Sequence, residues 1–142
     1  MIAFLKGRLA AKTESSVVID VGGVGYAVGM SAHSLSSMPA VGEPVQVYTY
    51  LLVREDALTL YGFANMAEKA LFERLISVSG VGPKVALAAL SSYTTEALSN
   101  AIIASDTTAV SRIPGIGKKT AQRIILELQG TLESASQQQD DL

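Results

Sequence analysis

The chain has 142 residues, of which 49% are hydrophobic and 17% charged, and its formal net charge is −2. This composition excludes a disordered polyelectrolyte and allows one ordinary domain or two small ones. Cysteine is absent and histidine occurs once, so disulfides, thiolate metal sites and histidine clusters are excluded. No apolar run reaches the roughly 20 residues of a membrane span, and the first residues lack the basic start of a secretory signal. We therefore expect a cytoplasmic protein without a membrane partner.

The first 64 residues have the pattern of a small β-barrel. Runs rich in β-forming residues are separated by turn signals and cover residues 16–21, 25–30, 45–53 and 57–63, after a first strand that carries Lys6, Arg8 and Lys12. A short helix is expected at residues 33–38. About five strands with one helical insert favour an OB-fold barrel, and a two-sheet sandwich is the alternative.

From residue 65 the apolar period becomes helical, so residues 65–130 predict an all-α second domain. The overall fold class is therefore α+β with two domains. The first of these helices is expected to have an apolar face of Ala67, Leu71, Leu75 and Val78. The second is expected to start at Pro83, and the next two to be capped by Thr94 or Thr95 and by Asp106. The last helix is expected to end at Gly130. Charges at residues 68–74 are expected on the helix surface. Residues 131–142 turn to Ser, Gln and Asp and predict the start of a flexible linker.

The helical half contains an internal repeat with a spacing of 35 residues. Gly80-Val81-Gly82 recurs as Gly115-Ile116-Gly117, and each copy lies between two predicted helices. Matching positions around the turns are Leu75 and Val110, Val78 and Ile113, Lys84 and Lys119, and Ala86 and Ala121. Glycines allow the chain to reverse sharply, while the central aliphatic residue can fill the small core between the helices.

Each turn leaves backbone N–H groups without partners at the start of the next helix, which is a favourable place for an anion. Residues 65–130 carry seven basic and five acidic side chains, and basic ones gather near these turns. The pattern is that of a helix-hairpin-helix motif, found in many proteins that hold duplex DNA by its backbone without reading bases. One copy is a weak signal because such turns also serve tight packing, but two copies in register favour DNA binding. The predicted DNA-binding residues are Gly80, Val81, Gly82, Lys84, Gly115, Ile116, Gly117, Lys118, Lys119 and Arg123.

Three enzymatic interpretations fail on the residues present. Gly117-Lys118-Lys119-Thr120 ends like a phosphate-binding P-loop, but Arg112 stands where its first glycine belongs. Gly80-Val81-Gly82 lacks the third glycine of a dinucleotide fingerprint and follows a helix. A base-excision glycosylase or lyase needs an activated acid or amine, and Asp106, the nearest acid, is placed as a helix cap. We therefore expect no catalytic site and no cofactor.

Five segments in order along the chain resemble the RuvA family, whose members recognise Holliday junctions. They are residues 22–26 (GGVGY), 53–57 (VREDA), 60–63 (LYGF), 81–84 (VGPK) and 114–121 (PGIGKKTA). The resemblance implies an OB-fold barrel that assembles a homotetramer, one or two tetramers on each junction, and hairpins that hold each arm in the minor groove. It also implies that Glu55 and Asp56 form an acidic pin at the crossover; without it, this pair is an ordinary solvated hairpin tip.

The resemblance further implies a non-catalytic specificity subunit that holds the junction open and planar. The motor RuvB would drive ATP-dependent branch migration, and RuvC would resolve the junction, in recombination and DNA repair. The family continues into a third helical domain that contacts the motor, whereas this sequence stops at Leu142 inside what resembles the linker, which leaves the RuvB contact open. The alternative is a general duplex-binding module that tethers a repair enzyme to DNA.

Overall fold

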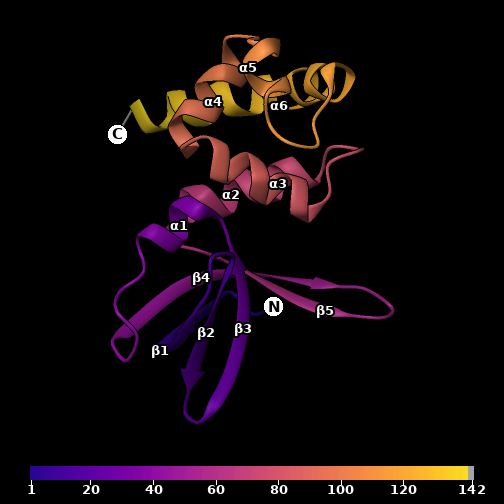
Figure 1. Cartoon of the computed structure of the whole chain (residues 1–142). Coiled ribbons are helices and arrows are strands. Elements are labelled where there is room, and N and C mark those ends of the chain that lie inside the picture. The colour runs from indigo at the N-terminus through magenta and orange to yellow at the C-terminus, as the bar shows by residue number, and fades with distance from the viewer. Residues whose placement is uncertain (141–142) are drawn as a thin grey trace. The chain divides into compact units, whose positions relative to one another are not determined.

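The computed structural model describes the backbone of residues 1–140 and the side chains of residues 1–135. The chain divides into two compact units, one covering Met1–Ala70 and a second that begins at Leu71 (Figure 1). We call them the barrel unit and the helical unit. The last strand, β5, ends at Phe63, and helix α2 begins at Met66. This agrees with the change from a strand pattern to a helical pattern at residue 65 of the sequence.

The barrel unit is a closed five-stranded barrel with the strand order β1-β2-β3-β5-β4. Its elements are β1 (Phe4–Lys12), β2 (Ser16–Val21), β3 (Val24–Met30), α1 (Ala32–Ser36), β4 (Pro44–Val53) and β5 (Leu58–Phe63). Neighbours are antiparallel except β3 and β5, which pair in parallel, and the barrel closes between β1 and β4. Closure confirms the predicted OB-type barrel and excludes the two-sheet sandwich.

The barrel interior is filled by alternate residues of the strands. Leu5 and Leu9 of β1 face inward, as do Val17 and Ile19 of β2 and Val45 and Val47 of β4. This period of two is what buries one face of each strand. At the parallel pair, a Cβ on Gly62 would lie 2.5 Å from Cγ1 of Val28, so only glycine lets β5 approach β3 there.

The helical unit consists of four complete helices and the second part of α2. The helices are α2 (Met66–Ile76), α3 (Pro83–Ser92), α4 (Thr95–Ile103), α5 (Thr107–Ser111) and α6 (Lys118–Asp140). The predicted helix starts are confirmed: Pro83 is the first residue of α3, and Thr94 and Asp106 cap α4 and α5 by accepting bonds from backbone amides. None of the helices in the described part of the chain is long and apolar enough to cross a membrane.

The last helix does not end at Gly130, and that prediction is wrong. α6 continues to Asp140, so residues 131–140 are helical where the sequence predicted the start of a linker. Leu128 and Leu132 are both buried and lie one helical turn apart. Burial of Leu132 opposes the roughly 1 kcal/mol cost of a glycine inside a helix, which explains why α6 passes through Gly130.

Helix α2 also differs from its predicted pattern. Ala67 was expected on the apolar face but is exposed, whereas Glu68, expected on the surface, is only 4% exposed. Its carboxylate accepts hydrogen bonds from the hydroxyls of Ser31 (2.7 Å) and Ser34 (2.8 Å). Ser34 in turn accepts a bond from the Ala64 amide. Glu68 therefore ties the first turn of α2 to α1, and its burial is possible because its oxygen is hydrogen-bonded.

Candidate nucleic-acid interface

The first hairpin turn joins α2 to α3 through Gly80, Val81 and Gly82. Gly80 has φ +92°, a backbone conformation that favours glycine. The Val81 amide donates to the Val78 carbonyl at 3.0 Å, and its side chain is buried in the helical unit. The turn is therefore closed by its own backbone and anchored by one aliphatic residue, as the sequence predicted.

The second turn, between α5 and α6, repeats this geometry 35 residues later. Gly115 has φ +88°, and the Ile116 amide donates to the Ile113 carbonyl at 3.0 Å. Ile116 is buried as Val81 is. The first bond of the following helix is equivalent too, from Ala86 to Gly82 in one copy and from Ala121 to Gly117 in the other, both at 2.9 Å. The internal repeat in the sequence is thus a repeat in structure.

The two turns pack reciprocally within the helical unit. A Cβ on Gly80 would lie 3.9 Å from Oγ1 of Thr120, at the start of α6. A Cβ on Gly115 would lie 3.0 Å from Cγ2 of Val85, at the start of α3. Val85 and Thr120 are equivalent positions of the repeat, so each turn touches the helix of the other copy in the same way. The helix starts that follow the turns are therefore brought together as an approximate two-fold pair.

Both helix starts present backbone N–H groups that precede the first intrahelical bond. Gly82, the N-cap of α3, makes no side-chain capping bond, and Pro83 has no N–H, so α3 offers the amides of Lys84 and Val85. The start of α6 offers the amides of Lys118, Lys119 and Thr120, because the first bond comes from Ala121. Together with the helix dipoles, these groups make both helix starts candidate anion sites.

Basic side chains surround these amides. Lys84, Lys118, Lys119 and Arg123 are all exposed, the first on α3 and the other three on α6. The structure brings all predicted residues of the two hairpins together in one unit. The charges are unequal, however, because the second hairpin carries three of the four cations.

Nothing in the described structure requires the second of the two glycines in each turn, Gly82 or Gly117, to be glycine. Gly82 has φ −89°, which any residue can adopt, and a Cβ on it would meet no atom within 4 Å. A Cβ on Gly117 would also meet open space. Glycine at these positions leaves the backbone bare toward solvent, which is what close approach of a ligand to the amides requires.

The acidic pair lies in the barrel unit, at the tip of the β4–β5 hairpin, which extends away from the barrel (Figure 1). The Arg54 amide donates to the Ala57 carbonyl at 2.9 Å, so Glu55 and Asp56 are the two central residues of a tight turn. Both are exposed. The hairpin below them pairs Val53 with Leu58, whose side chains are 59% and 71% exposed.

Sequence reasoning missed several residues that hold these elements in place. The Tyr93 hydroxyl donates to the Ala109 carbonyl at 2.7 Å, which ties the end of α3 to α5. Gln129 of α6 donates to the Ile103 carbonyl (2.8 Å) and the Ser105 hydroxyl (2.7 Å). Ser105 has φ +57°, so this side chain holds an unusual backbone turn before α5. Their partners lie 16 to 26 residues away, and no local pattern indicates them.

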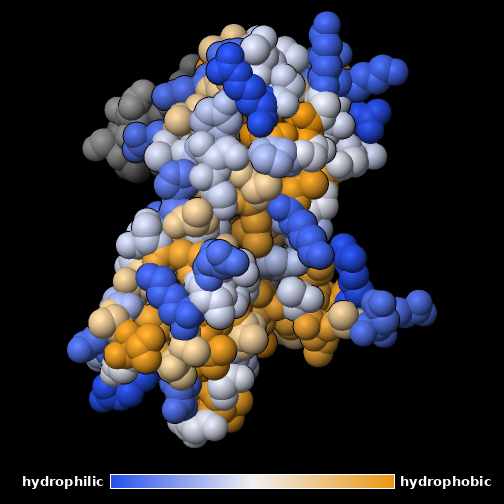
Figure 2. Space-filling view, in the orientation of Figure 1, coloured by the Kyte–Doolittle hydropathy of each residue, from blue (hydrophilic) through white to orange (hydrophobic). Residues whose placement is uncertain are grey.

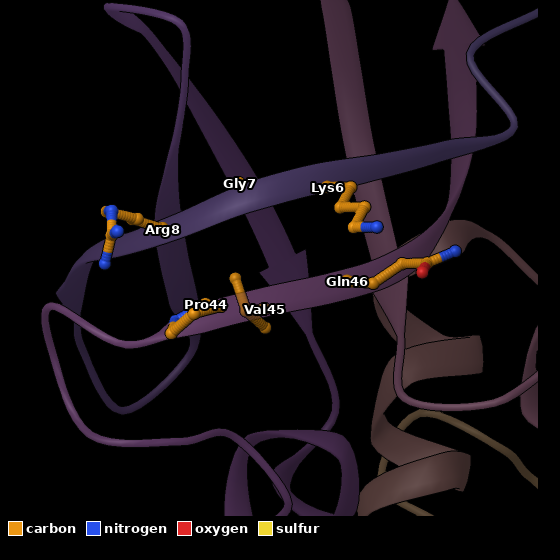
Figure 3. A pocket seen from close by; sticks show the side chains of 6 residues that line it. All are labelled: Lys6, Gly7, Arg8, Pro44, Val45 and Gln46. Atoms are coloured by element: carbon orange, nitrogen blue, oxygen red, sulfur yellow. The ribbon is translucent and has the colours of Figure 1, made fainter.

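A shallow hollow also lies on the outside of the barrel, where β1 pairs with β4 (Figure 3). Lys6, Gly7 and Arg8 line it from one strand, and Pro44, Val45 and Gln46 from the other. The Arg8 guanidinium donates to the Gly42 carbonyl at 3.1 Å. We assign no role to this hollow. Among the residues that the structure describes, no group of three or more His, Asp or Glu side chains could hold a metal ion.

The fold and the paired turns define a class of protein, in which a five-stranded barrel is joined to a tandem helix-hairpin-helix unit. Residues 1–62 match the family described as RuvA N terminal domain, and residues 72–129 match the SAM-like Helix-hairpin-helix tandem. The chain belongs to the RuvA family.

The similarity to individual relatives extends over both units. The relatives include several with the name Holliday junction branch migration complex subunit RuvA. The protein of Symbiobacterium thermophilum is 56% identical over 90% of this chain and 62% of its own length. Those of Thermobifida fusca and Marinomonas sp. are 54% and 48% identical, over 93% and 96% of this chain and 65% and 68% of their own lengths. The chain thus spans about two thirds of the relatives that it matches.

Proposed function

We propose that this protein binds four-way DNA junctions without sequence specificity, holds them open and planar, and serves as the specificity subunit of an ATP-driven branch-migration complex. The observation that carries the proposal is the pair of adjacent hairpin turns with bare backbone amides. Family membership supports a four-way junction as the DNA ligand, because the relatives are named as Holliday junction branch migration complex subunits.

The glycines at 82 and 117 support a backbone ligand most directly. Neither conformation nor packing within the described residues requires glycine at either position. A DNA phosphate that accepts bonds from the amides would come within contact distance of the turn, where a Cβ would obstruct it. Two sites related by an approximate two-fold axis suit duplex DNA, whose two strands run in opposite directions.

The predicted lack of sequence specificity follows from the same chemistry. Backbone amides and lysines bind phosphates, which carry no sequence information. The proposed contacts are the backbone amides of Lys84 and Val85 on α3 and of Lys118, Lys119 and Thr120 on α6. The side chains of Lys84, Lys118, Lys119 and Arg123 add positive charge beside them. Val81 and Ile116 are buried and support the turns from within.

The proposal includes a homotetramer formed through the barrel unit, with one or two tetramers on a junction. Apolar side chains are exposed over the barrel in the view of Figure 2, and the exposed residues of this unit include Phe4, Val53 and Leu58. Scattered exposed apolar residues are normal, but an exposed cross-strand pair such as Val53 and Leu58 is suited to an interface.

In such a tetramer we assign Glu55 and Asp56 to an acidic pin at the crossover. Four copies of an exposed hairpin tip would bring carboxylates close to converging phosphates. Like-charge repulsion then opposes collapse of the arms onto one another. The pair acts on junction shape and supplies no binding energy.

The wider complex is proposed from the family name. A RuvB motor would supply ATP hydrolysis, a RuvC resolvase would cut the junction, and the setting would be recombination and repair in the cytoplasm. This chain contributes binding and geometry and no chemical step.

A gel-shift titration that compares a synthetic four-way junction with linear duplex of equal length, together with a sizing run, tests the proposal. Tight, junction-selective binding by a tetramer is the expected result. Equal, weak binding to both DNAs by a monomer would replace it with the second candidate, a duplex-binding tether of a repair enzyme, which the hairpins alone would support.

A further inference from the structure

Thr120 belongs to the second hairpin but lies against the turn of the first. Its Oγ1 is the atom that a Cβ on Gly80 would meet, at 3.9 Å. The equivalent residue of the other copy, Val85, lies against Gly115 in the reciprocal arrangement. The repeat therefore puts an aliphatic side chain beside the second turn and a hydroxyl beside the first.

The Thr120 hydroxyl is available to a ligand. Thr120 is half-buried, and none of the side-chain hydrogen bonds among the described residues uses its hydroxyl. No fully buried side-chain oxygen or nitrogen in that part of the chain lacks a partner, so the unpartnered Thr120 oxygen is not fully buried. It can thus donate a hydrogen bond to an anion at the edge of the first turn.

The first turn is also the one that needs a further donor. Pro83 removes an N–H at the first position of α3, where Lys118 of the second copy supplies both an amide and a charge. Lys84 is the basic residue at the start of α3, whereas Lys118, Lys119 and Arg123 surround the start of α6. A donor from the second copy would make the first site more nearly equal to the second.

We propose that Thr120 completes the phosphate site of the first hairpin by donating its hydroxyl to the phosphate held by the Lys84 and Val85 amides. This inference rests on the proposed function, because it assumes that the two turns bind the DNA backbone. Thr120 would then act at the site of the first hairpin although it belongs to the second. Its neighbours Lys118 and Lys119 would bind the other DNA strand at the site of the second hairpin.

A double-mutant cycle tests the assignment. The variant Thr120→Val removes the hydroxyl, keeps the shape and reproduces the side chain of Val85, while Thr120→Ser retains the hydroxyl as the matched control. We expect Thr120→Val to weaken binding to linear duplex by about threefold to tenfold and Thr120→Ser to bind nearly as the parent. The salt dependence should keep its slope, because a neutral donor releases no counterion.

Each variant is then combined with Lys84→Ala or with Lys119→Ala. If Thr120 shares a phosphate with Lys84, the fold-loss of DNA affinity in Thr120→Val/Lys84→Ala will differ from the product of the two single fold-losses. In Thr120→Val/Lys119→Ala, the fold-loss of affinity will equal the product of the single fold-losses. Unchanged binding by a folded Thr120→Val, or coupling to Lys119 and not to Lys84, would overturn the inference and leave the proposed function standing. Failure of the parent protein to bind DNA would overturn the proposed function itself.

Discussion

The two hairpins of the helical unit have the same backbone and different chemistry. Both turns use a glycine with φ near +90°, a buried aliphatic residue and an equivalent first helical bond. The first is followed by Pro83 and Lys84, and the second by Lys118, Lys119 and, one turn later, Arg123. Glycine and aliphatic residues thus set the shape of both turns, and the proposed phosphate sites differ in the charge around them.

If the hairpins bind DNA as proposed, the two strands of a DNA arm would be held unequally. The second hairpin would contribute most of the counterion release, whereas the first would contribute mainly amide hydrogen bonds. A mildly acidic protein can still bind DNA in this way, because the local field at the turns matters more than the net charge of −2.

Removing lysines from the hairpins should have the largest effect on DNA binding. Lys118→Ala/Lys119→Ala should weaken junction binding by roughly tenfold or more, since two charged contacts per subunit are lost. It should lower the slope of log Kd against log salt about twice as much as Lys84→Ala does. Gel-shift titrations over a range of salt concentrations measure both. An unchanged slope in the double variant would remove these lysines from the contacts.

The second glycines should matter for binding and hardly at all for folding. Gly82→Ala and Gly117→Ala each place a methyl group in open space, so thermal unfolding should change by only a few degrees. Junction affinity should nevertheless fall severalfold, because the methyl group stands where a phosphate approaches. The matched control is Gly130→Ala, whose added Cβ also meets nothing within 4 Å but lies away from the turns on α6. Equal affinities for all three variants would contradict the assignment of the turns.

How far the sequence predicts this interface depends on how local each signal is. The turns are local, since a glycine, an aliphatic residue and flanking helices all lie within a few positions, and the 35-residue repeat doubles the signal. Glu68 could not be predicted, because its serine partners lie 37 and 34 residues earlier. The predicted helix end at Gly130 was wrong for the same reason. The local propensity of glycine to end a helix is overcome by burial of Leu132, which depends on packing. The contact of Thr120 with the first turn likewise arises only when the two copies pack together.

Replacing the first glycine of each turn should lower the free energy of unfolding. Gly80→Ala and Gly115→Ala both force a side chain into the left-handed region, at a cost of about 1 to 2 kcal/mol. Gly115→Ala should be the more destabilising of the two, because its Cβ would lie 3.0 Å from Val85 while that of Gly80→Ala has more room. Urea unfolding measures the difference. A larger loss for Gly80→Ala would show that the turns do not pack reciprocally.

The smallest effect on affinity is expected in the barrel unit. Glu55→Gln/Asp56→Asn should leave junction binding unchanged or slightly tighter, because repulsion from phosphates is removed. Junction conformation, followed by energy transfer between dyes on two arms, should move away from the open form. A large loss of affinity would instead mean that the acidic pair is structural.

Hydrogen exchange of the whole chain with and without a four-way junction tests directly whether both turns bind the DNA backbone. We expect peptides covering residues 80–86 and 115–121 to gain protection together, since both sets of amides would donate to phosphates. Protection of only one of the two turns, or of neither, at DNA concentrations that saturate binding would contradict a paired backbone interface.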